Sequence, residues 1–275
     1  MRKGWAVPVI LGLALCGAIS GLAAAQLAPN PRVEFGYIPP KTAKFQAMHD
    51  RLKKRQVLEQ LAVFLAPLRL PMTLKIQIDE CSALTRVVTR AGGATICYEY
   101  LEAIEKAAAA AAGKDKVKRK QYFTGAFIQS TLYRVALLAL DILDAPIWGR
   151  YTDAADRLAA AVMLEFNPEY ALAGFSGANV FFKAQKKDWT GADFASINQP
   201  AAQRRYNYLC MAYGFDDTTY DMFKKPLGNR AEGNLCEAEY KQGSLSFFTL
   251  LWPHIDEDKA EMIKDIQFIR PDDIE

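Results

Sequence analysis

Residues 130–161, STLYRVALLALDILDAPIWGRYTDAADRLAAA, decide how this chain folds. Residues 124–143 are apolar on almost every side, a pattern typical of a helix buried in the centre of a protein. Pro146 and Gly149 interrupt that pattern, and helical spacing of apolar residues resumes over residues 153–166. We therefore expect two consecutive core helices joined by a short turn.

The residues before this stretch predict a small sheet. Apolar residues recur near helical spacing over residues 41–65, which predicts one helix ended by Pro67 and Pro71. Residues 72–79 alternate between apolar and polar, as a half-buried strand does. Residues 84–89 and 94–98 predict two more strands, joined by a turn at residues 90–93. Together these strands predict a small antiparallel sheet.

The remainder of the chain predicts helices. Residues 101–112 include six consecutive alanines and favour a helix, which Gly113 ends, and residues 114–120 are interpreted as a basic connector. Further helices are expected at residues 168–187, 200–213 and 244–251, with Asn198 as the N-cap of the second of these. The predicted fold class is α+β, with a small antiparallel sheet and a predominantly helical body.

The first 25 residues have the pattern of an export signal. Arg2 and Lys3 precede an apolar run over residues 5–22, and Ala23-Ala24-Ala25 supplies the small residues that precede a cleavage site. An uncleaved membrane anchor is the alternative, since the run approaches the roughly 20 residues that span a bilayer. We expect a signal at residues 1–25, an extended lead-in at 26–40 and one domain at 41–275, in a periplasmic or secreted protein.

Composition excludes some classes of function. Removal of residues 1–25 takes away two basic residues, so the formal charge falls from +3 to about +1. Proteins that bind nucleic acid carry a concentrated basic footprint, which a nearly neutral chain lacks. An apolar fraction of 51% indicates an ordered globular protein. We therefore expect no nucleic-acid partner, and a membrane partner only if the signal segment stays uncleaved.

Four cysteines follow the signal segment, and an even number in an exported chain predicts disulfides. Of the three possible pairings, local hairpin geometry favours Cys81–Cys97 together with Cys210–Cys236. Four buried free thiols are the alternative. A cysteine zinc site is disfavoured because the chain contains no Cys-x-x-Cys.

Several segments together resemble a bacterial family of putative metallopeptidases. Residues 132–159 resemble the family pattern F-H-E-L-G-H-A-L-I-D-x-L-x-L-P-V-x-G-R-E-E-D-A-A-D-x-L-A, and residues 203–214 resemble Q-R-x-x-N-x-L-C-x-x-Y-G. The resemblance covers residues 41–256. It implies a zincin-like α+β fold, and the family's early and late cysteine pairs support the disulfide pairing given above.

The resemblance also implies where a zinc site belongs. The zinc motif His-Glu-x-x-His places two imidazoles one helical turn apart, with the Glu as general base. Here the three positions hold Tyr133, Arg134 and Leu137, and the family's acidic third ligand falls on Thr152. A family histidine before the helix at 200–213 falls on Asn198. The family implies zinc, yet none of these residues is suited to the task, so we predict no metal and no cofactor.

The altered cleft has four candidate binding residues. Arg134 lies within an apolar helical pattern, and a charged residue in such a place is normally paired, so we expect an ion pair with Asp153 or Asp156. Binding of an anion by Arg134 is the alternative. Together with Asn198, these residues define the predicted cleft.

These observations lead to two hypotheses of function. The first is an exported, disulfide-bonded, zincin-like protein that has lost zinc and catalysis and that binds a peptide or a cell-envelope protein. The second is a hydrolase, a peptidase with a non-standard site. Bound zinc, or peptide cleavage that a chelator abolishes, would favour the second.

Overall fold

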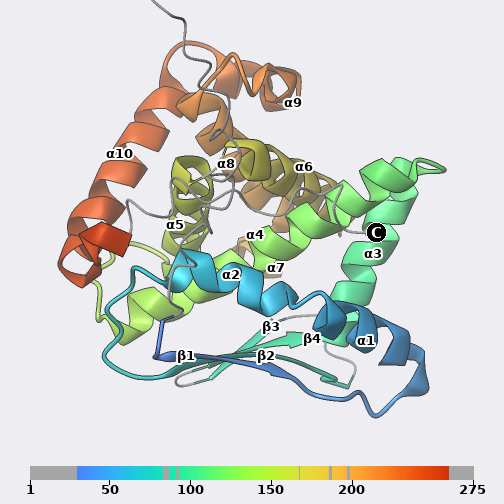
Figure 1. Ribbon diagram of the computed structural model, residues 1–275. Helices are drawn as coiled ribbons and strands as arrows, with labels where there is room; N and C mark the ends of the chain where they lie inside the picture. Colours follow the sequence, from blue (N-terminus) through green and yellow to red (C-terminus); the bar gives the residue numbers. More distant parts are fainter. Residues whose placement is uncertain are drawn as a thin grey trace, which may run out of the picture.

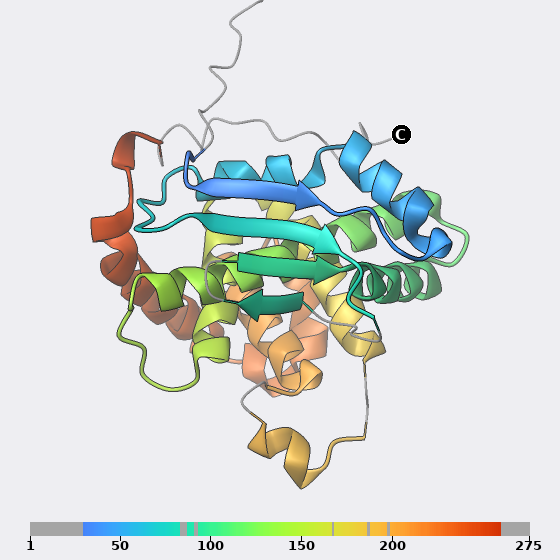
Figure 2. The same ribbon diagram turned by 90° about the horizontal axis from the view of Figure 1, so that it is seen from below.

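The computed structural model describes residues 30–82, 87–90, 93–166, 168–185, 188–196 and 199–259 (Figure 1). The predicted export signal at residues 1–25 and the predicted cap Asn198 lie outside the described residues. A sheet forms one layer, and helices pack on one of its faces, as the two perpendicular views show (Figures 1 and 2).

The sheet has the strand order β1-β2-β4-β3, with β1 (Val33–Tyr37), β2 (Leu74–Asp79), β3 (Val87–Arg90) and β4 (Gly93–Cys97). Strands β1, β2 and β4 run parallel, and β3 pairs antiparallel with β4 (Figure 2). The prediction of an antiparallel sheet is therefore wrong for β2, which pairs in parallel with both of its neighbours, while the antiparallel pairing expected between the two later strands is confirmed by β3 and β4. Parallel neighbours require a crossover connection, and the helices between β1 and β2 provide it.

Strand β1 belongs to residues that were expected to form an extended lead-in. The segment is extended, but it pairs with β2 in register from Val33 opposite Leu74 to Tyr37 opposite Ile78. Strand β2 confirms the predicted alternation, because Leu74, Ile76 and Ile78 are buried while the residues between them are more exposed. The packed domain therefore begins before residue 41.

The helix predicted at residues 41–65 is two helices. A short 3-10 turn, η1 (Ala43–Phe45), leads into α1 (Gln46–Lys54), and α2 (Val57–Leu65) follows. Between them Gln56 has φ 50°, a left-handed conformation that a continuous right-handed helix cannot contain. The break lets α1 and α2 run in different directions above the sheet (Figure 1).

The longest described helix is α4 (Lys116–Ile142), which follows α3 (Tyr98–Ala112) after a turn at Gly113. The basic connector predicted at 114–120 is mostly the first turn of α4. Asp115 caps this helix by accepting a hydrogen bond from the backbone N of Lys118 at 3.0 Å. The apolar part of α4 is long enough to span a membrane, but 72% of it is buried within the protein, as in a central core helix.

Further helices surround α4 (Figure 1). The predicted helices at 153–166, 168–187 and 200–213 are present as α5 (Tyr151–Phe166), α6 (Pro168–Ala184) and α8 (Ala201–Phe215). The predicted helix at 244–251 is the second half of α10 (Leu235–Leu251), and the short α7 (Gly191–Ala195) and α9 (Lys224–Leu227) were not predicted. The expectation of a mostly helical body is confirmed.

Both predicted disulfides are present. Cys81, just after β2, is bonded to Cys97 at the end of β4, and Cys210 of α8 is bonded to Cys236 of α10. The first disulfide joins two neighbouring parallel strands and the second joins two packed helices. Disulfides of this kind persist in oxidising compartments, so they are consistent with an exported protein.

Candidate functional site

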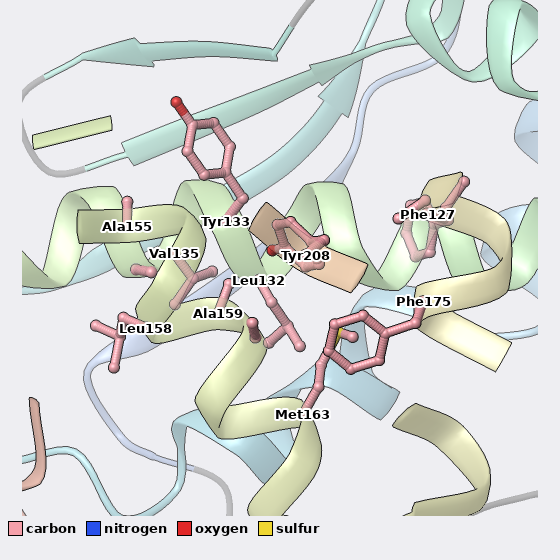
Figure 3. Close-up of a cluster of buried hydrophobic side chains, with 14 of the residues drawn as sticks. Phe127, Leu132, Tyr133, Val135, Ala155, Leu158, Ala159, Met163, Phe175 and Tyr208 are labelled. Carbon is pink, nitrogen blue, oxygen red and sulfur yellow. The ribbon is translucent and has the colours of Figure 1, made fainter. Parts of the chain in front are cut away.

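The positions that the resemblance identifies as the zinc motif lie on one side of α4. Tyr133, Arg134 and Leu137 are within one helical turn of one another, and Tyr133 is buried, at 3% exposure. Figure 3 shows Tyr133 projecting from α4 toward the strands, while Leu132 and Val135 project from the opposite side toward α5. The helix therefore presents two different faces to its surroundings.

A buried ion pair lies beside Tyr133. Asp156 of α5, at 2% exposure, accepts two hydrogen bonds from Arg204 of α8, from Nε to Oδ2 and from Nη2 to Oδ1, each 2.7 Å long. The two parallel bonds are the bidentate arrangement in which a guanidinium matches a carboxylate best. This ion pair joins α5 to α8.

Two guanidinium groups lie against the ring of Tyr133. The Cζ atom of Arg204 is 4.3 Å from the ring centroid and that of Arg134 is 4.8 Å from it. Arg204 also lies 4.8 Å from the ring centroid of Phe182 on α6. Attraction between a guanidinium and an aromatic face strengthens when both are desolvated. The tyrosine is therefore held by cation–π contacts.

Burial changes the acid–base behaviour of this cluster. Burial raises the pKa of the Asp156 carboxyl, and the adjacent Arg204 partly opposes that rise. Burial also raises the pKa of the Tyr133 phenol, with Arg204 again opposing it. A phenol with a raised pKa stays neutral at ordinary pH. Tyr133 is therefore a neutral ring among charged groups.

Arg134 is not paired as expected. Asp156 is bonded to Arg204 instead, and within the described residues Arg134 forms no ion pair with Asp153 or any other carboxylate. The predicted pair with Asp156 is absent because both carboxylate oxygens of Asp156 accept hydrogen bonds from Arg204, which lies 48 residues away in sequence. Burial lowers the pKa of the Arg134 guanidinium, which nonetheless remains charged at ordinary pH.

The other predicted site residues lie around this cluster. Thr152 and Asp153 are half-buried in the first turn of α5, where the Thr152 hydroxyl is 3.4 Å from Asp153 Oδ1. Leu137 is half-buried and packs against the hydrophobic core. Asn198 lies outside the described residues. The structure thus brings Tyr133, Arg134 and Asp156 together.

A second polar cluster joins residues from the downstream matching segments. Arg230 donates to Asn207 Oδ1 at 2.9 Å and to Glu239 Oε2 at 2.6 Å. Arg157 donates to Glu239 Oε1 at 3.0 Å. Asn207 in turn donates to Gln199 at 2.9 Å. These bonds connect α5, α8 and α10 near the second disulfide and have the character of a structural network.

Among the residues that the structure describes, no group of potential metal ligands converges at the Tyr133 cluster. In the described part of the chain, one group of three potential ligands lies close together, namely Cys81, Cys97 and Glu99. The two cysteines form a disulfide and offer no thiolate. The two histidines, His49 of α1 and His254 near the end of the described chain, belong to different elements.

Residues 37–251 match the family described as Putative metallopeptidase (DUF4344). The chain belongs to this family. No curated protein and no solved structure matches the chain. The matched residues include all of α4 and α5.

The sequence of this family member did not reveal Arg204 as a site residue. It was recognised only as part of the matching segment 203–210. The available signal was the surplus of carboxylates at Asp153 and Asp156, which lie in an alanine-rich, buried helix and require a cation nearby. Which cation supplies it depends on how α8 packs against α5, and local patterns do not specify that.

Proposed function

We propose that this member of the metallopeptidase family is an exported protein that does not hold zinc and that binds a peptide or a cell-envelope protein without catalysis. We call the side of α4 that carries Tyr133, Arg134 and Leu137 the motif face. The observation that supports the proposal is that the ring of Tyr133 and the guanidinium groups of Arg134 and Arg204 occupy this face. The two disulfides support export.

The residues present do not fit a zinc ion. Zinc requires imidazole, thiolate or carboxylate ligands in tetrahedral geometry. The motif positions offer a neutral phenol, a guanidinium and an alkyl group, and Thr152 offers a hydroxyl. The Asp156 carboxylate is already engaged by Arg204 through both oxygens. A divalent cation would also be repelled by Arg134 and Arg204 at short range.

The same residues suit recognition of a peptide. Arg134 is partly exposed and forms no ion pair among the described residues, so its N–H donors are available to a carboxylate or a main-chain carbonyl of a ligand. The ion pair of Asp156 and Arg204 holds the neighbouring ring in place. A site of this kind binds through preorganised donors.

Metal analysis of the purified protein tests the loss of zinc. We expect less than about 0.1 equivalent of zinc after exposure to excess zinc and gel filtration, and no chelator-sensitive cleavage of a peptide library. Stoichiometric zinc, or cleavage that a chelator abolishes, would contradict the proposal and favour the alternative of a peptidase with a non-standard site.

A reconstruction provides the matched control. The full-length quadruple variant Tyr133→His, Arg134→Glu, Leu137→His, Thr152→Glu restores the family's ligand set, and the triple variant that keeps Leu137 lacks one imidazole. We expect at least tenfold tighter zinc binding by the quadruple variant than by the triple variant, measured with a competing chelator. Equal binding by the two would show that these positions do not correspond to the family's metal ligands.

Peptide binding is tested separately by titrating a random peptide library against the protein and against Arg134→Met. We expect bound sequences to lose at least fivefold in affinity with Arg134→Met, since the substitution removes the guanidinium but keeps a long apolar stem. Unchanged binding would exclude Arg134 from the site.

A further inference from the structure

An apolar pocket of about 310 Å³ lies on the side of α4 away from Tyr133. From α4 it is lined by Leu132, Val135, Ala136 and Ala139, and other walls come from α5, α10 and the segment after α2. Figure 3 shows Leu132 and Val135 pointing away from Tyr133 and toward Leu158 and Ala159 of α5. The pocket is therefore distinct from the motif face.

The charges at this pocket have one sign. Glu165, at the end of α5, and Glu257, beyond α10, are its two charged lining residues, and its described lining contains no Lys or Arg. Glu165 accepts a hydrogen bond from the Tyr240 hydroxyl but remains exposed. An apolar pocket with two carboxylates is complementary to an apolar group with a positive charge beside it.

Exposed apolar residues continue from the pocket along α10. Leu245 is 70% exposed, Phe248 is 36% exposed and Trp252 is 53% exposed. Leu245 and Phe248 are three residues apart and lie on one side of α10. Trp252 begins the 3-10 turn that follows α10, and Phe248 and Trp252 also line the pocket. The apolar surface is thus longer than the pocket, which favours an elongated occupant over a compact small molecule.

We propose that this pocket binds a peptide segment of another protein that has large apolar side chains next to Lys or Arg. One apolar side chain enters between α4, α5 and α10, the adjacent residues lie along Leu245 and Phe248, and a cationic side chain reaches Glu165 or Glu257. The proposal goes beyond the function proposed above, because it uses the opposite face of α4 and involves neither Tyr133 nor Arg134.

The pocket, rather than the charges at its rim, should supply most of the affinity. Buried pockets that take one large side chain contribute most of the affinity of many interfaces, while charges at the rim contribute less and mainly select the partner. Filling the pocket should therefore weaken binding more strongly than removing one carboxylate. This difference in the loss of affinity distinguishes binding in the pocket from nonspecific electrostatic attraction to the carboxylates.

Fluorescence anisotropy with labelled helical peptides tests the proposal. The probe is a 14-residue peptide of leucine and lysine with its leucines on one face. Two control peptides have the same length; one carries glutamate in place of lysine, and the other carries serine in place of leucine. With the full-length protein we expect saturable binding of the leucine–lysine probe and at least tenfold weaker binding of both control peptides. Equal binding of the glutamate peptide would overturn the proposed charge preference.

Variants locate the binding. Ala136→Leu and Val162→Phe each extend a side chain into the pocket, and we expect either to weaken binding at least tenfold. Glu165→Gln combined with Glu257→Gln should weaken it about fivefold and reduce its salt dependence. Glu237→Gln, an exposed carboxylate at the other end of α10, is the matched control and should leave binding unchanged. Circular dichroism verifies that each variant is folded, and unchanged binding by a folded pocket-filling variant would overturn the proposal.

Another occupant would give a different result. Residues 260–275 follow the described chain and contain Ile263, Ile266 and Phe268. If the probe binds the full-length variant Ile263→Ser, Ile266→Ser, Phe268→Ser but not the unaltered chain, the pocket is a site for the protein's own C-terminal residues, and the proposal of a separate partner is wrong. Because Arg134→Met leaves this pocket unchanged, failure here is distinguishable from failure of the proposed function.

Discussion

The two faces of α4 are both largely removed from water, but they are filled in different ways. On the motif face, Tyr133 lies against the guanidinium groups of Arg134 and Arg204, and Asp156, the carboxylate partner of Arg204, is nearly completely buried. On the pocket face, Leu132, Val135 and Ala136 are also buried, yet an open volume of about 310 Å³ remains beside them. Polar and cation–π contacts surround Tyr133 on the motif face, whereas the apolar side chains on the pocket face leave a cavity between α4, α5 and α10.

The difference has an energetic consequence. Burying a charge is costly unless a partner compensates it, so the motif face depends on every member of its ion pair. Apolar contacts are individually weak and tolerate changes of shape where there is free volume. We therefore expect the motif face to be sensitive to the loss of single groups and the pocket face to tolerate the addition of atoms.

The largest expected effect is the loss of Asp156. The change Asp156→Ala leaves the largely buried Arg204 guanidinium without its carboxylate. Breaking a buried ion pair from one side costs about 3–5 kcal/mol of unfolding free energy. Urea denaturation measures it. The change Asp141→Ala, at an exposed residue of α4, should cost less than about 0.5 kcal/mol. A cost below about 1 kcal/mol for Asp156→Ala would mean that Arg204 finds another partner or water.

A smaller effect on the free energy of unfolding is expected when atoms are added at two positions of α4. Gly125 lies where α4 meets α6, and a Cβ atom there would be 1.9 Å from the carbonyl oxygen of Ala173. We expect Gly125→Ala to cost about 1–3 kcal/mol through overpacking, or more if α6 cannot move. Ala136→Leu adds more atoms but places them in the pocket, so it should change the free energy of unfolding by less than about 1 kcal/mol. Thermal and urea denaturation of both variants test the contrast, and similar costs would mean that the pocket is closed in solution.

Most of the helical body could be predicted from the sequence. Helices α5, α6 and α8 follow from apolar spacing and from the break at Pro146 and Gly149. Both disulfides were favoured by local hairpin geometry with support from the family resemblance, and both are present. These signals are local, which is why they can be read from one chain. The start of α4 was missed because its Lys-rich first turns resemble a solvated loop, although lysine is a good helix former.

The sheet shows where local signals end. Val33, Phe35 and Tyr37 alternate along β1, so a strand was detectable within the expected lead-in. Alternation gives the two faces of a strand but not the direction of its neighbour. The parallel pairing of β1 with β2 depends on how α1 and α2 cross over, and that of β2 with β4 depends on β3 taking the outer position of the sheet. The break at Gln56 likewise has no glycine to mark it.

The candidate site could be predicted only in part. Family membership is established for residues 37–251, whereas the correspondence of Tyr133, Arg134 and Thr152 to the family's zinc motif rests on the resemblance and stays a prediction. The partner of Asp156 could not be predicted, since Arg204 and Arg134 are both cations at helical positions and only the packing of α8 selects between them. Contacts between elements distant in sequence require the assembled structure.

The smallest expected effect concerns pH and again separates the two faces. Burial raises the pKa of Tyr133 above the ordinary value of a tyrosine, about 10. Above pH 10 the unfolded chain therefore loses a proton that the folded protein keeps, so this tyrosine contributes stability that is complete below pH 10 and is lost as the pH rises through its folded pKa.

The slope from one such group is at most about 1.4 kcal/mol per pH unit. Urea denaturation between pH 8 and pH 11 of the unaltered protein and of Tyr133→Phe measures it, because phenylalanine keeps the ring between Arg134 and Arg204 but cannot ionise. We expect the variant to lose less stability over this range, while Ala136→Leu on the pocket face should follow the unaltered protein. Parallel curves for Tyr133→Phe and the unaltered protein would mean that the phenol is open to water, and the motif face would then be as accessible as the pocket.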